Sequence, residues 1–232
     1  MSLIIAMQVP TGIVLAGDSR ATGESSNDSV DPSDPNKTIK KVMQLMLSDA
    51  ANKVFKVYHR FGVGVYGAGT IASLPVAHYI EKFELDNLEP PTNTMELANT
   101  ILTYFRNITP IPACYFTVVG FDGEPSLYGV DILGNNATRQ YFDVATGTLQ
   151  YGPFMGGDIA IVQRLLSDPT HNPPFPLMNI QDAADFARHL IRTTIDQLRF
   201  EPRFATVGGP IDTLVVTPAG CVFIEQKALV AR

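Results

Sequence analysis

Short apolar runs near the start of the chain predict a sheet that begins close to the N-terminus. Residues 2–9 and 13–18 are rich in β-branched side chains and are separated by a Pro-Thr-Gly turn, so they predict a β-hairpin. Residues 53–58 alternate between polar and apolar side chains, which is typical of a half-buried strand. Residues 61–66 follow as its expected partner and lead into Gly67.

The segment between these two strand pairs has a different character. Residues 22–36 are polar, acidic and rich in residues that break regular structure, and this composition predicts a loop. Residues 38–47 turn apolar again and fit either a strand or a short helix. We therefore expect a polar insertion, whose role the pattern does not indicate.

Apolar positions spaced three and four residues apart predict four helices. The first two span 71–84 and 94–107, and the other two span 157–167 and 179–199. The second helix is preceded by an Asn with a Glu three residues later, which is the pattern of a capping box. Further strands are expected at 113–121, 126–132, 138–144, 211–217 and 221–226.

The order of these elements predicts the fold class. Antiparallel hairpins alternate with pairs of helices, which favours an α+β arrangement of two antiparallel sheets with helices outside them. No repeat, linker or change of composition divides the chain. We therefore expect a single domain over residues 1–232.

Composition narrows the class of protein. The formal net charge of −6 gives no basic surface for nucleic acid or an anionic membrane. Cys114 and Cys221 are the only cysteines, so no disulfide framework or zinc site is expected, and a reducing cytoplasm is favoured. No stretch approaches the roughly 18 apolar residues of a membrane helix, and no signal peptide is visible. We expect a cytoplasmic protein without cofactor or metal.

Ser2 is the first candidate for chemistry. A serine after the initiator methionine is small enough for that methionine normally to be removed. Removal would leave Ser2 with a hydroxyl and a free α-amine, which titrates near pH ~8 and can serve as general base for that hydroxyl. Many proteins begin with Met-Ser, so other residues must support this interpretation.

Three residues at strand ends could provide that support. Asp18 ends the second expected strand, where a partly desolvated carboxylate needs a cation, and Lys53 opens a later strand. Such a pair could tune a neighbouring nucleophile, or it could be an ordinary strand-end ion pair. Gly67 could present a backbone N–H to the oxyanion of an acyl-transfer intermediate, or it could serve only a turn.

Blocks of sequence in a fixed order resemble the proteasome β-type subunits, which are N-terminal-nucleophile hydrolases. The chain looks like a divergent, bacterial-type homologue. The spacing from Ser2 to Asp18 matches that from the family's nucleophile to its aspartate. The matching blocks are Ile13–Thr22 with its Asp-Ser-Arg, Lys53–Gly67, Val119–Asp131 and the Gly-Gly-X-Ile-Asp block Gly208–Asp212.

The resemblance implies a fold, an activity and a set of roles. The fold would be a four-layer α-β-β-α sandwich of two antiparallel sheets flanked by helices. Ser2 would be the nucleophile, Asp18 and Lys53 would activate it, Arg20 would support the site, and Gly67 would bind the oxyanion. The protein would be a homo-oligomeric ring that hydrolyses peptides or unfolded polypeptides.

Several positions depart from the family pattern. The nucleophile is serine where the family usually has threonine, and Asp18 and Lys53 are unusually far apart because of the polar insertion, which makes Lys41 an alternative lysine. Gly156 stands where the family has a helper serine. The Asp and Ser before the late Gly-Gly block are replaced by Phe204 and Val207.

Other interpretations remain open. The segment 62–67 fits the G-x-G-x-x-G dinucleotide fingerprint, but a strand with alternating polarity precedes it instead of a buried parallel strand. The segment 17–21 lacks the second glycine of a nucleophile elbow, and the four histidines have no metal-ligand spacing. A non-catalytic ring subunit and a small-molecule amidase or acylase of the same fold are the two rival functions.

Overall fold

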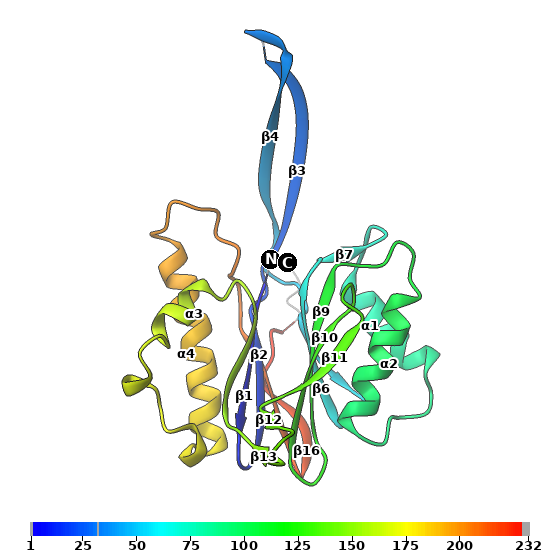
Figure 1. The fold of residues 1–232 in the computed structure, drawn as a ribbon, viewed down its shortest axis with the longest axis vertical. Helices are drawn as coiled ribbons and strands as arrows, with labels where there is room; N and C mark the ends of the chain where they lie inside the picture. Colours follow the sequence, from blue (N-terminus) through cyan, green and yellow to red (C-terminus); the bar gives the residue numbers. More distant parts are fainter. Residues whose placement is uncertain (1, 32, 229–232) are drawn as a thin grey trace.

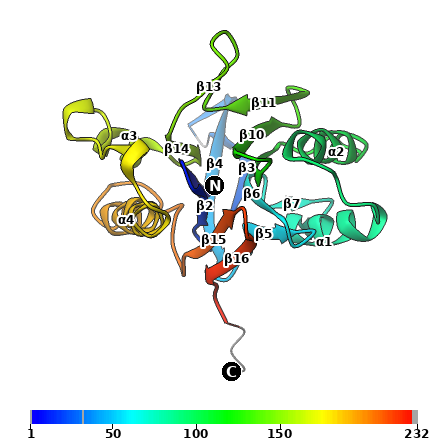
Figure 2. The ribbon, with the colours of Figure 1, turned by 90° about the horizontal axis from the view of Figure 1, so that it is seen from below.

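A computed structural model describes residues 2–31 and 33–228 (Figure 1). Strands occupy the middle of the molecule, and helices lie on both outer sides. One long two-stranded hairpin projects away from this body, and Figure 2 shows the two groups of helices on opposite sides of the strands. The described chain is therefore a mixed, largely antiparallel α+β fold.

The first sheet brings the beginning and the end of the chain together. Its strand order is β14-β1-β2-β15-β16, and all neighbours are antiparallel. The strands are β1 (Leu3–Val9), β2 (Gly12–Gly17), β14 (Gly152–Gly157), β15 (Asp212–Thr217) and β16 (Gly220–Glu225). Every residue of β1 and β2 is buried, because the two strands lie in the middle of the sheet and are covered on both faces.

The second sheet has the order β11-β10-β9-β6-β5, again antiparallel throughout. Its strands are β5 (Val54–Val57), β6 (Phe61–Gly67), β9 (Cys114–Phe121), β10 (Pro125–Asp131) and β11 (Asn136–Gln140). The G-x-G-x-x-G segment lies within β6, between two antiparallel neighbours. Neither a parallel strand nor a helix start is present there, so the dinucleotide interpretation fails.

The helices begin where the sequence provides caps. Asn93 and Asn179 accept hydrogen bonds from the backbone N–H groups of Glu96 and Asp182, which satisfies donors that a helix start leaves free. The helices are α1 (Val76–Asp86), α2 (Thr94–Arg106), α3 (Ala160–Leu165) and α4 (Ile180–Leu198), with short 3-10 turns η1 (Pro169–His171) and η2 (Phe175–Leu177).

Three apolar clusters hold these elements together. Successive side chains of a strand point to opposite faces, so β1 contributes Leu3 and Ile5 to one cluster and Ile4 to another. The first cluster joins the β1 sheet to α3 and α4, and a second joins the β6 sheet to α1 and α2. The cluster containing Ile4 also includes Val119 and Leu127, so it lies between the two sheets.

The projecting hairpin corrects one prediction. The expected loop at 22–36 is instead mostly strand: β3 (Ala21–Asp31) pairs with β4 (Asp34–Ser48), and Pro32 lies outside the described residues. Residues 38–47 are strand and not helix. The composition of residues 22–36 predicted a loop because the apolar residues of the hairpin lie on β4. The polar β3 is a strand because its backbone groups pair with those of β4.

Several boundaries also differ from the prediction. The first helix starts at Val76 because β7 (Thr70–Ile71) and β8 (Leu74–Pro75) pair before it. The expected strand at 138–144 is broken into β11 and β12 (Phe142–Asp143), which pairs with β13 (Thr148–Leu149). The expected helix at 157–167 shrinks to α3. The strand before it, β14, was missed because Gly and Pro are uncommon inside strands.

The strand pairs at 2–9 with 13–18 and at 53–58 with 61–66, and the helices at 94–107 and 179–199, are confirmed within a few residues. Among the described helices, none is long and apolar enough to cross a membrane.

Candidate functional site

Ser2 lies immediately before β1 and is held by the end of β14. Its carbonyl oxygen accepts a 2.8 Å hydrogen bond from the backbone N–H of Asp158. Gly157 adopts φ +96°, and a Cβ on it would lie 1.7 Å from the same oxygen, so only glycine fits there. The first described residue of the chain is therefore fixed in the fold and is mostly buried.

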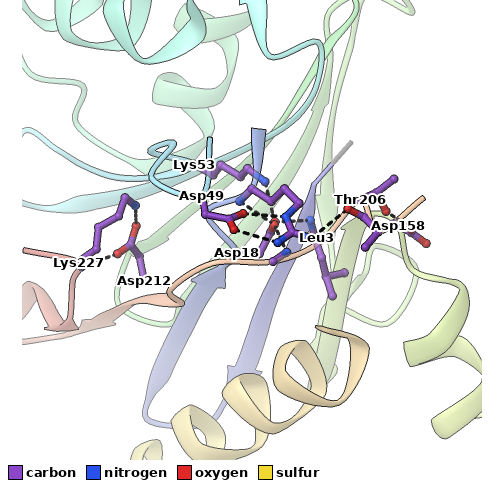
Figure 3. A network of polar contacts seen from close by, with 11 residues as sticks. Leu3, Asp18, Asp49, Lys53, Asp158, Thr206, Asp212 and Lys227 are labelled. Atoms are coloured by element: carbon purple, nitrogen blue, oxygen red, sulfur yellow. Dashed lines mark hydrogen bonds and ion pairs between the residues drawn. The ribbon is translucent and has the colours of Figure 1, made fainter. Parts of the chain in front are cut away.

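Asp18 follows β2 and is completely buried. Its Oδ1 accepts hydrogen bonds from Lys53 Nζ (2.8 Å) and from the backbone N–H of Leu3 (2.9 Å). Its Oδ2 accepts from the backbone N–H groups of Arg20 (3.1 Å) and Gly208 (3.0 Å). The carboxylate thus connects β1, the lysine strand and the late Gly-Gly block (Figure 3).

Lys53 precedes β5 and is only 5% exposed. Burial lowers the pKa of its ammonium below 10.5, and the attraction of Asp18 only partly offsets this effect. Lys227, which pairs with Asp212, lowers the pKa of Lys53 further through charge repulsion. Lys53 is therefore the cation that faces Asp18, and it releases its proton more readily than an exposed lysine.

Lys41 does not fill this position. It lies within β4, opposite Asn27, seven residues before the strand ends at Ser48. At ~3.3 Å per residue, Lys41 is about 23 Å along the hairpin from Ser48. The long insertion between Asp18 and Lys53 projects as a hairpin, so their large separation in sequence does not keep their side chains apart.

Arg20 supports the site from the side. Its Nε and Nη2 donate to the two carboxylate oxygens of Asp49 at 2.7 and 2.9 Å, and its Nη1 donates to the carbonyl of Ala205. A Cβ on Gly208 would lie 2.4 Å from the guanidinium carbon, so glycine makes room for this contact. The hydrogen bond to Asp49 raises the pKa of Arg20, and the same bond lowers the pKa of Asp49. Asp49 was missed by the sequence interpretation.

Gly67 ends β6 in a conformation that requires glycine. Its φ is +96°, and a Cβ on it would lie 2.5 Å from the carbonyl oxygen of Ala113. Gly67 and the predicted residues Ser2, Arg20 and Lys53 all line one cavity of about 620 Å³. Asp18 lies behind this cavity and contacts it through Lys53.

The base of the projecting hairpin forms one wall of the cavity. Gly23, Glu24, Leu47 and Ser48 come from the inner ends of β3 and β4. Small or apolar lining residues come from β6, the residue after it and the start of α1, namely Val65, Ala68, Val76 and Ala77. A ligand in the cavity would therefore contact both the body and the hairpin.

A second buried carboxylate lies beside Ser2 and was also missed. Asp158 follows β14, and its Oδ2 accepts hydrogen bonds from Arg203 Nη1 (2.5 Å) and from the hydroxyl of Thr206. Burial would raise the pKa of Asp158, but these two hydrogen bonds and the positive charges of Arg203 and of the chain's amino terminus lower it overall. The carboxylate is therefore ionised at neutral pH.

The positions that depart from the family pattern have clear structural surroundings. A Cβ on Gly156 would lie 2.2 Å from the ring of Tyr66, so Tyr66 occupies the space that a serine side chain would need. Val207 packs in the apolar cluster under the first sheet, and Phe204 carries no polar group. These three residues cannot donate the hydrogen bonds of their counterparts.

Neither a protein-family model nor a curated protein sequence matches this chain. Within the described residues there is also no group of three His, Cys, Asp or Glu side chains that could hold a metal ion.

Proposed function

We propose that this protein is an N-terminal-nucleophile hydrolase that cleaves peptide bonds with Ser2, in a four-layer α-β-β-α fold. The observation that carries the proposal is convergence at one cavity. Ser2, the buried Lys53–Asp18 pair and Gly67 come from separate segments, and Ser2, Lys53 and Gly67 line the same space. An ordinary strand-end ion pair and a glycine needed only for a turn would not be expected to lie together beside Ser2.

The reaction requires that the peptide bond before Ser2 is cleaved. The new α-amine then takes the proton from the Ser2 hydroxyl while Oγ attacks the substrate carbonyl carbon. The tetrahedral intermediate collapses when the C–N bond breaks, and the leaving amine takes that proton. Water then attacks the carbonyl carbon of the Ser2 ester and gives a proton to the α-amine. The C–Oγ bond breaks as the amine passes that proton to Oγ, which releases the carboxylic acid and restores Ser2.

Lys53 and Gly67 have separate roles in this scheme. The positive charge of Lys53, held by Asp18, stabilises the negative charge that develops on Oγ during attack. Gly67 lines the cavity, and its backbone N–H would donate to the carbonyl oxygen as that oxygen becomes an oxyanion. The shape of Gly67 supports this role, because no side chain can cover the N–H.

We also propose that the protein forms a homo-oligomeric ring in the cytoplasm that encloses the cavities. Support comes from the projecting hairpin, where Val42, Met43, Leu45, Met46 and Leu47 are each between 44% and 63% exposed. A contiguous exposed row of this kind is uncommon in a monomer and marks a site of association. A ring would limit access to peptides and unfolded polypeptides.

One observation favours the non-catalytic ring subunit as a second candidate. Gly156, Phe204 and Val207 cannot supply the side-chain hydrogen bonds that the resemblance leads one to expect. A subunit of that kind would assemble without cutting. The small-molecule amidase differs from both, since it would act on short amides without a ring.

Hydrolysis of a panel of fluorogenic peptide amides tests these functions. The peptidase proposal predicts turnover of peptide amides by the wild-type chain, retained by Ser2→Thr and lost in Ser2→Ala. Turnover confined to short acyl amides by a monomer would indicate an amidase. If the assembled wild-type protein hydrolyses none of these substrates, the protein is a non-catalytic ring subunit.

A further inference from the structure

Two buried carboxylates belong to residues that contact the backbone at Ser2 and Leu3. Asp18 is linked to the chain through the backbone N–H of Leu3, and Asp158 through its own backbone N–H to the carbonyl of Ser2. In the view of Figure 3, Leu3 is drawn between Asp18 and Asp158. Either carboxylate could in principle hold the amine that forms when Ser2 becomes the first residue.

Asp18 has little capacity left for that amine. Its two oxygens already accept four hydrogen bonds, one from Lys53 and three from backbone N–H groups. A carboxylate offers about four lone-pair positions, so a further donor would have to displace one of these partners. Each partner belongs to a different segment of the site, and displacing one would disturb the fold.

Asp158 has capacity to spare. Its Oδ2 accepts from Arg203 and Thr206, whereas the bond from Arg203 Nη2 to its Oδ1 is long, at 3.3 Å. Thr206 is almost completely buried, so its hydroxyl fixes the carboxylate where solvent does not compete. The backbone N–H of Asp158 also bonds to the Ser2 carbonyl, so this carboxylate belongs to a residue that contacts Ser2 itself.

We propose that Asp158, held by Thr206 and Arg203, is the positioning residue that binds the α-amine of Ser2. It would replace the supporting side chains that are missing at Phe204 and Val207. This inference rests on the proposed function, because it assumes that Ser2 acquires a free amine. A side chain would thus still bind the α-amine, but this side chain would be Asp158 at the end of β14, held in place by Thr206.

The charged groups near Ser2 determine how the pKa of its α-amine should respond to a substitution. Asp158 would stabilise the protonated amine, while Arg203, which also pairs with Glu201, would oppose it. Asp18 and the Arg20–Asp49 pair are each matched by their own partners. Removing the negative charge of Asp158 alone therefore takes away a charge that favours the protonated amine, which lowers the pKa of the amine.

The test is a titration of the α-amine in the full chain beginning at Ser2, prepared by cleaving a removable leader. The rate of acetylation of the N-terminal peptide is measured by mass spectrometry against pH. We expect Asp158→Asn to lower the pKa of the amine by about one pH unit. Thr206→Val should shift it in the same direction by less, and Thr206→Ser should restore the wild-type value.

Asp168→Asn is the matched control, because Asp168 also accepts a hydrogen bond from a threonine, Thr170, but on the exposed surface. It should leave the amine unchanged. The inference is overturned if Asp158→Asn and Thr206→Val both titrate like the wild type. If Asp158→Asn does not fold, the inference is tested by comparing the pKa of the amine in Thr206→Val with that in Thr206→Ser.

Titration of the amine does not depend on hydrolysis, so the two proposals can fail separately. If the wild-type chain hydrolyses nothing but the pKa of the amine shifts in Asp158→Asn, the proposed hydrolase is wrong and the role of Asp158 in binding the amine stands. If the chain cleaves peptides but the pKa of the amine does not shift in Asp158→Asn, the proposed hydrolase stands and Asp158 does not bind the amine.

Discussion

At the scale of single residues, the buried ion pair between Lys53 and Asp18 is the feature on which the site depends. Two charges are removed from water here, and the pair is stable only because backbone N–H groups also satisfy Asp18. The sequence predicted this pair from its place at strand ends. It did not predict Asp49 and Asp158, because nothing local in the sequence distinguishes them from surface aspartates.

Replacing Lys53 should damage both stability and chemistry. Lys53→Met leaves the Asp18 carboxylate buried without its cation, which typically costs about 3–5 kcal/mol in the free energy of unfolding. Denaturant unfolding measures this loss, and acylation of Ser2 should slow in the fraction that stays folded. Lys56→Met is the control, because Lys56 is exposed on β5, directly after Lys53, and should change neither. Equal stability of the two variants would contradict the account.

The Asp158 carboxyl makes a prediction for stability in acid. Its pKa is lowered from 3.8, so the folded state binds its proton less readily than the unfolded state. Its contribution to stability is therefore complete above pH 3.8 and disappears as the pH falls through the lowered pKa. Unfolding free energies of wild type and Asp158→Asn should converge below pH 3.8. A constant difference down to the lowest measurable pH would contradict the assigned charge.

At the scale of elements, the projecting hairpin shows the limit of reading strands from composition. Long apolar runs such as β1 and β2 were predictable because burial on both faces demands apolar side chains at every position. The polar strand β3 has no such pattern, since it depends on backbone pairing with β4. The glycine-rich β14 was unpredictable for a similar reason, because its role is close approach to Ser2 and not packing of large side chains.

The exposed row on β4 should control assembly. The double variant Met43→Glu, Leu45→Glu places charges on one face of the hairpin and should lower the solution mass towards that of a monomer. Stability of the monomer should change by less than about 0.5 kcal/mol, because both side chains are exposed. Leu88→Glu is the control, since Leu88 is 80% exposed on the body. Light scattering that gives one mass for all three proteins would remove the hairpin from the interface.

At the scale of the whole molecule, the two sheets face each other and bring the beginning of the chain beside segments far along it. The order of strands and helices was enough to predict an α+β fold of antiparallel sheets, because hairpins and helix pairs alternate along the sequence. The cavity could not be predicted, because its walls include the base of a hairpin that was expected to be a loop. Ser2 lines this cavity together with Lys53 and Gly67, which come from distant parts of the sequence.

The most direct test of that account is the intact mass of the purified protein before and after exposure to a peptide-like electrophile that acylates hydroxyl groups. The account predicts a chain without Met1, which lies outside the described residues, and a single adduct located on Ser2 and absent in Ser2→Ala. A chain that keeps Met1 and gains no adduct would contradict the proposed hydrolase and leave a non-catalytic subunit.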